Sequence, residues 1–286
     1  MKHLARPTDK SAQLLLAGEV FETCVSMVRN PALKAKLRAA RPKVEAEAAD
    51  YADQAEQGRL YTKLKHSAVG AASADEMVSV YTSRMVPKSA SGRAVYDHIM
   101  SLPAHGRCPF CGIGTVNTLD HYLPKQDFPV FSVSPDNLVP ACTWCQGEKM
   151  EYHSSTEGGQ ILHPYFDDFD DDIWLSAEVI ESAPAAFRFF AMPPDHWTQP
   201  RKERVAAHLR ELGLHRLFSS NAGSRLSEIR ARLTGLFQKG GATEVRAHLH
   251  EELTSLEADQ KNSWTAAMYR AAIGSDWFCQ GGFLQS

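Results

Sequence analysis

Two Cys-x-x-Cys pairs constrain the fold of this chain more than any other feature of its sequence. Cys108 and Cys111 form the first pair, Cys142 and Cys145 form the second, and residues 112–141 lie between them. Each pair turns tightly enough for two thiolates to reach one Zn²⁺, and two pairs complete a tetrahedral site without an open ligand position. The spacing therefore predicts a structural zinc that ties together both ends of this segment.

The composition favours a metal over disulfides for these cysteines. The chain has 286 residues and a formal net charge of −3, and 43% of its residues are hydrophobic, which is enough for a core. It has no apolar run near the roughly 20 residues that span a bilayer, and its N-terminal stretch lacks the apolar region of a secretory signal. We therefore expect a cytoplasmic protein without a membrane segment, where paired cysteines indicate a metal site. Cys24 and Cys279 have no partner spacing and are expected to be core thiols.

Hydrophobic periodicity predicts helices on both sides of the cysteine segment. Residues 11–30 have one apolar helical face, residues 93–102 form a short helix before the first pair, and patterns of i, i+4, i+7 recur from residue 205 onward. Residues 178–190 are expected to add a strand or hairpin. The predicted fold is mainly α with a small α+β core, in three parts: a helical region at 1–92, the zinc-stapled core at 93–166 and a mostly helical region at 167–286.

Inside the cysteine segment, the sequence predicts two short strands followed by a helix. Residues 118–123 alternate as a strand does and contain the dipeptide Asp120-His121. Residues 137–140 form a second candidate strand. A helix is expected to begin near the second cysteine pair and to continue through Lys149. The expected order is strand, long loop, strand and helix. One zinc ion, bound by both cysteine pairs, is expected to hold the two ends of this segment together.

This order and several of its residues resemble the ββα-metal core of the HNH endonucleases. The similarity lies in Leu119-Asp120-His121, in Asn137-Leu138-Val139-Pro140-Ala141-Cys142 and in Cys145-Gln146-Gly147-Glu148-Lys149. The stretches HPYFDD and NSWTAAMYRAA resemble, more loosely, bacterial HNH proteins associated with phage defence, such as the nuclease subunit of Septu systems. The resemblance implies a role in antiphage defence, DNA as the substrate and an ATPase partner subunit.

The residue types suit phosphodiester hydrolysis. The neutral imidazole of His121 can accept a proton from water, because its ordinary pKa lies near working pH. Asp120 points to the opposite face of its strand and offers a hard oxygen ligand for Mg²⁺ or Mn²⁺. By resemblance, Asn137 orients the imidazole or steadies the loop. The resemblance also assigns the second ligand of the catalytic ion to Gln146, the residue after the last cysteine.

Gln146 departs from the family pattern, which usually has Asn or His at this position. Glutamine keeps the amide oxygen but lengthens the side chain by one methylene. Its helical neighbours Lys149 and Met150 offer no hard oxygen, and water can complete the coordination of Mg²⁺. Lys149 and Lys125 are the candidates for contacts with phosphate groups.

The sequence therefore predicts a metal-dependent HNH endonuclease that cuts DNA and leaves 5′-phosphate and 3′-hydroxyl ends. Two alternatives stay open. In one, the nuclease site has decayed and the chain is a zinc-stapled DNA-binding or assembly module, which Gln146 favours. In the other, the enzyme acts on RNA.

Overall fold

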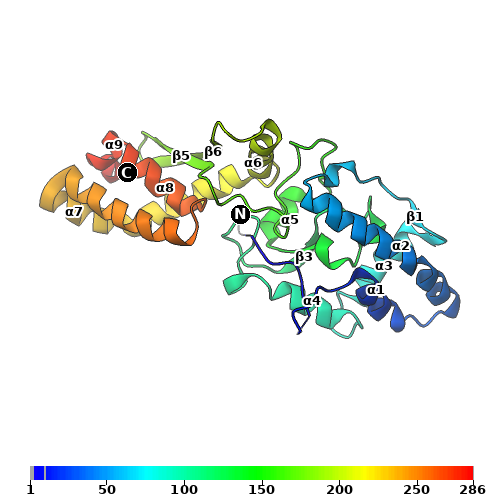
Figure 1. Cartoon of the computed structure of the whole chain (residues 1–286). Coiled ribbons are helices and arrows are strands. Elements are labelled where there is room, and N and C mark those ends of the chain that lie inside the picture. The colour runs from blue at the N-terminus through cyan, green and yellow to red at the C-terminus, as the bar shows by residue number, and fades with distance from the viewer. Residues whose placement is uncertain (1–2, 10, 286) are drawn as a thin grey trace. The chain divides into compact units, whose positions relative to one another are not determined.

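The computed structural model describes residues 3–9 and 11–285 of the chain (Figure 1). It has two compact units, one through Asp167 and one from Asp168 onward. The regions predicted at 1–92 and 93–166 lie together in the first unit. The chain is mainly helical with small antiparallel sheets, as the sequence predicted. No helix in the described ranges is both long and apolar enough to cross a bilayer.

The N-terminal part of the first unit is built from capped helices. Asn30 accepts a hydrogen bond from the backbone N–H of Leu33 at the start of the long second helix, and Ser73 and Glu76 form a reciprocal capping box at the third. Residues 66–92 contain a small hairpin and a short helix. The elements are α1 (Ala17–Ser26), α2 (Pro31–Glu56), β1 (Ala68–Val69), β2 (Ala72–Ser73), α3 (Ala74–Arg84) and α4 (Arg93–Met100).

The cysteine segment folds as two antiparallel strands and a helix. Strand β3 (Thr118–His121) pairs with β4 (Leu138–Ala141), with His121 opposite Leu138. Helix α5 (Thr143–Lys149) follows directly. Every residue of β4 is buried, and α4 packs against both strands. Short 3-10 turns lie at Leu60–Thr62, Ala104–Gly106, Pro129–Phe131 and Pro135–Asn137.

The second unit combines a hairpin with helices. Its strands are antiparallel, and the hairpin begins three residues earlier than residues 178–190 predicted. One strand packs on α8 and the other on α7, which is interrupted at Gly240 and Gly241. The elements are β5 (Leu175–Ile180), β6 (Ala186–Ala191), α6 (Gln199–Glu211), α7 (Leu214–Asp259), α8 (Trp264–Gly274), α9 (Asp276–Cys279) and a 3-10 turn at Gly282–Leu284.

Candidate metal centre and hydrolytic site

The four paired cysteines converge on one point, as their spacing predicted. Cys108, Cys111, Cys142 and Cys145 are all buried, and their sulfur atoms lie within 4.8 Å of one another. The Sγ atoms of Cys111 and Cys142 are 3.8 Å apart. Tetrahedral zinc with Zn–S bonds of about 2.3 Å places its sulfur ligands about 3.8 Å apart. The four thiols therefore fit a zinc ion.

The backbone around the first pair supports the cluster. The N–H groups of Ile113 and Gly114 donate to the Sγ of Cys111, at 3.5 and 3.3 Å. A side chain at Gly114 would bring a Cβ to 2.5 Å from the Sγ of Cys142, so only glycine fits against the cluster there. Hydrogen bonds from Cys108 lower the pKa values of Cys111 and Cys142, and hydrogen bonds within the cluster raise the pKa values of Cys108 and Cys145. Thiolate is the form that binds metal.

The two remaining cysteines lie in the apolar interior. Cys24 and Cys279 are fully buried. Burial raises the pKa of Cys24 to about 12 and also raises that of Cys279. Both thiols are therefore protonated and unreactive, as expected of core residues.

The dipeptide at the end of β3 lines a surface pocket of about 280 Å³. Asp120 and His121 lie on its wall, together with Gln146 of α5, Lys125 of the following loop and Tyr81 of α3. The Tyr81 ring meets the His121 imidazole edge-on, with ring centroids 4.5 Å apart. We call this space the Asp120–His121 pocket. Of the residues that the sequence singled out, it brings together Asp120, His121, Gln146 and Lys125, but neither Asn137 nor Lys149 lines it. It adds Tyr81, which the sequence did not indicate.

Hydrogen bonding fixes the tautomer of His121. Its Nε2 lies 2.8 Å from the backbone oxygen of Ser132. A carbonyl oxygen only accepts hydrogen bonds, so Nε2 carries the proton and Nδ1 of the neutral ring carries a lone pair. Burial lowers the pKa of His121 from 6.5 to about 3. The imidazole is therefore held neutral, with one nitrogen able to accept a proton.

The depressed pKa of His121 predicts an acid-sensitive fold. Between pH 6.5 and about 3, the unfolded chain binds a proton at this residue that the folded chain does not. The stabilisation is therefore complete above pH 6.5 and is lost as the pH falls. From pH 7 to pH 5, wild type should lose about 2 kcal/mol more of its free energy of unfolding than His121→Gln, which cannot titrate. Urea unfolding at the two pH values without added divalent ions measures this, and equal losses would contradict the burial of a neutral imidazole.

Lys149 does not lie where the sequence placed it. Predicted as a phosphate contact, it is 1% exposed. Its Nζ donates to the backbone oxygen of His121 at 2.6 Å and lies 3.2 Å from Oδ2 of Asp120. Burial raises the pKa of Asp120 and lowers that of Lys149, while the ion pair opposes both shifts. Because packing of α5 against β3 encloses this ammonium group, Lys149 orders the end of β3 and is not available to a phosphate.

Asn137 steadies the loop between the two strands. Its Oδ1 accepts from the backbone N–H of Leu123 at 2.8 Å, and its Nδ2 donates to the backbone oxygen of Leu123 at 3.0 Å. The resemblance implied that Asn137 either orients the imidazole or steadies the loop. These contacts support the role in the loop, because they are made to the loop backbone and not to the imidazole of His121.

A buried chain of side chains continues from Asn137. The Nδ1 of His163 accepts from the N–H of Tyr165 at 3.2 Å, so its Nε2 donates to the Tyr51 hydroxyl, 3.0 Å away. Tyr51 in turn donates to Oδ1 of Asn137 at 3.2 Å. Through this chain, α2 supports the strand loop, a link that the sequence gave no signal to find.

The pocket has donors that suit a hard divalent ion. Asp120 offers a carboxylate and Gln146 an amide oxygen, and both residues line the pocket together with His121. Gln146 is exposed at the surface of α5. Mg²⁺ accepts such oxygen ligands and retains several waters, so this set fits it when water supplies the remaining positions. Lys125 is half-buried at the same pocket, with its Nζ 5.9 Å from the centre of the Tyr81 ring.

These features define a mainly helical protein with a buried four-cysteine site of the kind that holds zinc. No family model matches the chain, and no solved structure matches it significantly. It is 31% identical over 222 residues to protein ea31 of Escherichia phage lambda, with 72% of this chain and 74% of the relative covered. The chain belongs to the family of that lambda protein.

Proposed function

We propose that this chain is a metal-dependent HNH endonuclease that hydrolyses DNA phosphodiester bonds. The observation that carries the proposal is the state of His121, a neutral imidazole whose Nε2 is fixed by Ser132 and whose Nδ1 keeps its lone pair. It lies beside Asp120 in a pocket open to solvent, next to a zinc-type cluster. A neutral imidazole with a lone pair beside a carboxylate can take a proton from water, and its lowered pKa makes it a weaker base than a free imidazole.

The residues of the pocket divide the reaction between them. Nδ1 of His121 takes a proton from water, whose oxygen attacks the phosphorus. The bond to the 3′ oxygen breaks, and this leaving oxygen takes up a proton from solvent. The products are a 5′-phosphate and a 3′-hydroxyl. Asp120 and Gln146 would hold the divalent ion, which supplies positive charge for the phosphate and the leaving oxygen. Lys125 also lines the pocket, which supports a contact between its ammonium group and a phosphate of the strand.

The biological setting rests on the HNH resemblance alone. The similarity to defence-associated nucleases supports a role in antiphage defence with an ATPase partner. Mixing the purified chain with an extract of its host tests the partner, since the cleavage rate should then increase.

A second candidate is a zinc-stapled DNA-binding or assembly module with a decayed nuclease site. The ion pair between Lys149 and Asp120 favours it, because an ammonium group neutralises the carboxylate that would bind the ion. Incubating the protein with plasmid, single-stranded DNA and structured RNA, each with Mg²⁺, Mn²⁺ or EDTA, decides between these candidates. Metal-dependent cleavage of DNA supports the proposed nuclease. Cleavage of RNA alone supports an enzyme that acts on RNA, and binding without cleavage supports the DNA-binding or assembly module.

Gln146 provides a direct test of the divalent-ion site. If its amide oxygen binds the ion, Gln146→Ala should raise the Mg²⁺ concentration for half-maximal cleavage about tenfold, because one ligand is lost. Gln146→Asn, which restores a family-typical residue, should retain or increase activity. Zinc content and melting temperature should not change, since the side chain is exposed.

The matched control is Gln126→Ala, which removes an exposed glutamine that does not line the pocket. Its Mg²⁺ dependence should equal that of wild type. If Gln146→Ala also behaves like wild type, Gln146 is not a ligand. If wild type is inert and Gln146→Asn cleaves, the decayed module becomes the better assignment.

A further inference from the structure

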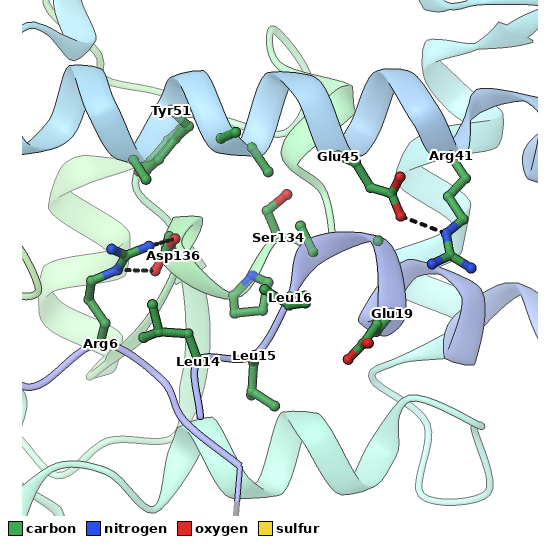
Figure 2. Close-up of a pocket in the computed structure, with 16 residues that line it drawn as sticks. Arg6, Leu14, Leu15, Leu16, Glu19, Arg41, Glu45, Tyr51, Ser134 and Asp136 are labelled. Carbon is green, nitrogen blue, oxygen red and sulfur yellow. Dashed lines mark hydrogen bonds and ion pairs between the residues drawn. The ribbon is translucent and has the colours of Figure 1, made fainter. Parts of the chain in front are cut away.

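A second pocket, of about 380 Å³, lies in the first unit away from the Asp120–His121 pocket (Figure 2). It is bounded by α2 on one side, by the start of α1 and the chain before it on the other, and by the turn at residues 134–136. Its lining is mostly apolar. The apolar side chains are those of Leu14, Leu15, Leu16, Ala17, Ala48, Ala49, Ala52 and Pro135. We call this space the α2 pocket.

An ion pair stands at each end of the α2 pocket (Figure 2). Arg6 binds Asp136 through two contacts, Nε to Oδ1 at 3.0 Å and Nη2 to Oδ2 at 2.7 Å. Arg41 binds Glu45 at 2.8 Å. A further carboxylate, that of Glu19, lies on the rim. Because each guanidinium already faces a carboxylate, the pocket has no free positive charge for an anionic ligand, and its ends limit the length of what it holds.

One buried polar group in the α2 pocket has no partner. Ser134 is 3% exposed, and its hydroxyl makes no hydrogen bond to any residue within 3–9 and 11–285. The backbone groups of Ser134 are both used, its N–H by Phe131 and its oxygen by Asn137. In Figure 2 the hydroxyl points toward α2, across the pocket. A buried hydroxyl without a partner is costly, and an acceptor brought by a ligand would remove that cost.

The hydroxyl of Ser132, two residues earlier, has a hydrogen-bond partner, unlike that of Ser134. Its hydroxyl is also buried but donates to the backbone oxygen of Pro129 at 2.7 Å. Ser132 also supplies the carbonyl that fixes His121. The segment that holds the imidazole therefore continues directly into the wall of the α2 pocket.

We propose that the α2 pocket binds a compact, uncharged and largely apolar molecule that accepts a hydrogen bond from the Ser134 hydroxyl. The volume and apolar lining match those of ligand sites in proteins, in which a few polar groups set the orientation. The neutralised rim selects against carboxylates and phosphates. This assignment does not depend on the proposed nuclease activity, because none of the residues that would carry cleavage lines the pocket.

Quinoline and naphthalene provide a matched pair of probes. Both are uncharged at pH 8 and have the same shape, and only quinoline has a ring nitrogen that accepts a hydrogen bond. Titration of the ¹⁵N-labelled full chain, followed by amide chemical shifts, gives both the affinity and the location. The chemical-shift changes caused by quinoline should reach saturation at a quinoline concentration below about 10 mM. Its affinity should fall about tenfold in Ser134→Ala, as expected for one lost hydrogen bond, whereas naphthalene should bind both proteins equally.

Filling the pocket provides the second arm of the test. Ala49→Trp should abolish binding of both probes, and Ala46→Trp, at an exposed position of α2 outside the lining, should preserve it. If Ala49→Trp does not fold, Ala52→Phe narrows the same wall. The proposal is overturned if quinoline does not saturate, if it binds the filled variants as well as wild type, or if Ser134→Ala leaves its affinity unchanged.

Discussion

Replacing Cys108 or Cys142 by Ser is expected to release the zinc and to destabilise the first unit. The four sulfur atoms lie within 4.8 Å of one another and form a closed site, so the loss of one leaves three buried thiols around an incomplete coordination sphere. The free energy of unfolding should fall by at least about 3 kcal/mol, a fraction of the roughly 10 kcal/mol that zinc contributes in small zinc domains. Cys142 also precedes the first residue of α5, so the helix that carries Gln146 and Lys149 should lose its anchor.

Metal analysis and urea unfolding measure this effect. Wild type should contain about one zinc per chain, and the Cys108→Ser and Cys142→Ser variants almost none. Cys279→Ser is the matched control, because it also changes a buried thiol but lies outside the cluster. It should keep its zinc. A zinc-free wild type that unfolds at the same urea concentration as the zinc-bound protein would contradict a structural role for the metal.

The parts of the structure that the sequence predicted are those specified by local spacing. Two cysteines separated by two residues meet on one turn, so the cluster followed from the pattern alone. A strand beginning at Thr118 and a helix ending at Lys149 were also predictable, because side-chain periodicity is a local property, although the strand ends at His121 and not at residue 123. The order of strand, loop, strand and helix was predicted in the same way, whereas the pairing of β3 with β4 was not.

The parts that could not be predicted depend on contacts between residues far apart in the chain. Tyr51 reaches Asn137 across 86 positions, and no local pattern marks either as a partner. Lys149 follows Gln146 by one helical turn, which is compatible with exposure or burial. Only the packing of α5 on β3 decides that its ammonium group meets Asp120. The α2 pocket is likewise formed by segments that the sequence gave no reason to bring together.

Contacts of the same long-range kind explain why the Asp120–His121 pocket rests on both halves of the first unit. Tyr81 of α3 packs against the His121 ring and donates through its hydroxyl to the backbone oxygen of Leu119 at 2.9 Å. Ser132 fixes the other side of the ring. The N-terminal helices are therefore part of the support of the imidazole, and a fragment containing only residues 93–166 would expose it.

Removal of the His121 imidazole should abolish most cleavage if the proposed function is correct. His121→Ala deletes the only nitrogen proposed to take the proton from water, and loss of a general base slows hydrolysis by at least roughly 100-fold. The variant should keep its zinc and bind DNA, because His121 is not a cluster ligand. Initial rates on plasmid DNA at saturating Mg²⁺ measure the change, and Asp120→Ala should be similarly inactive.

His121→Gln separates the base from the hydrogen bond to Ser132. Its side-chain amide can donate to the Ser132 oxygen as Nε2 does, but it has no nitrogen that accepts a proton at the position of Nδ1. This variant should retain more stability than His121→Ala and be equally inactive.

His153→Ala, which changes a histidine outside the Asp120–His121 pocket, should cleave at the wild-type rate. Added imidazole should restore part of the activity of His121→Ala, because a small base can enter the space that the side chain left. If highly purified His121→Gln cleaves DNA at the wild-type rate, another residue must activate the water.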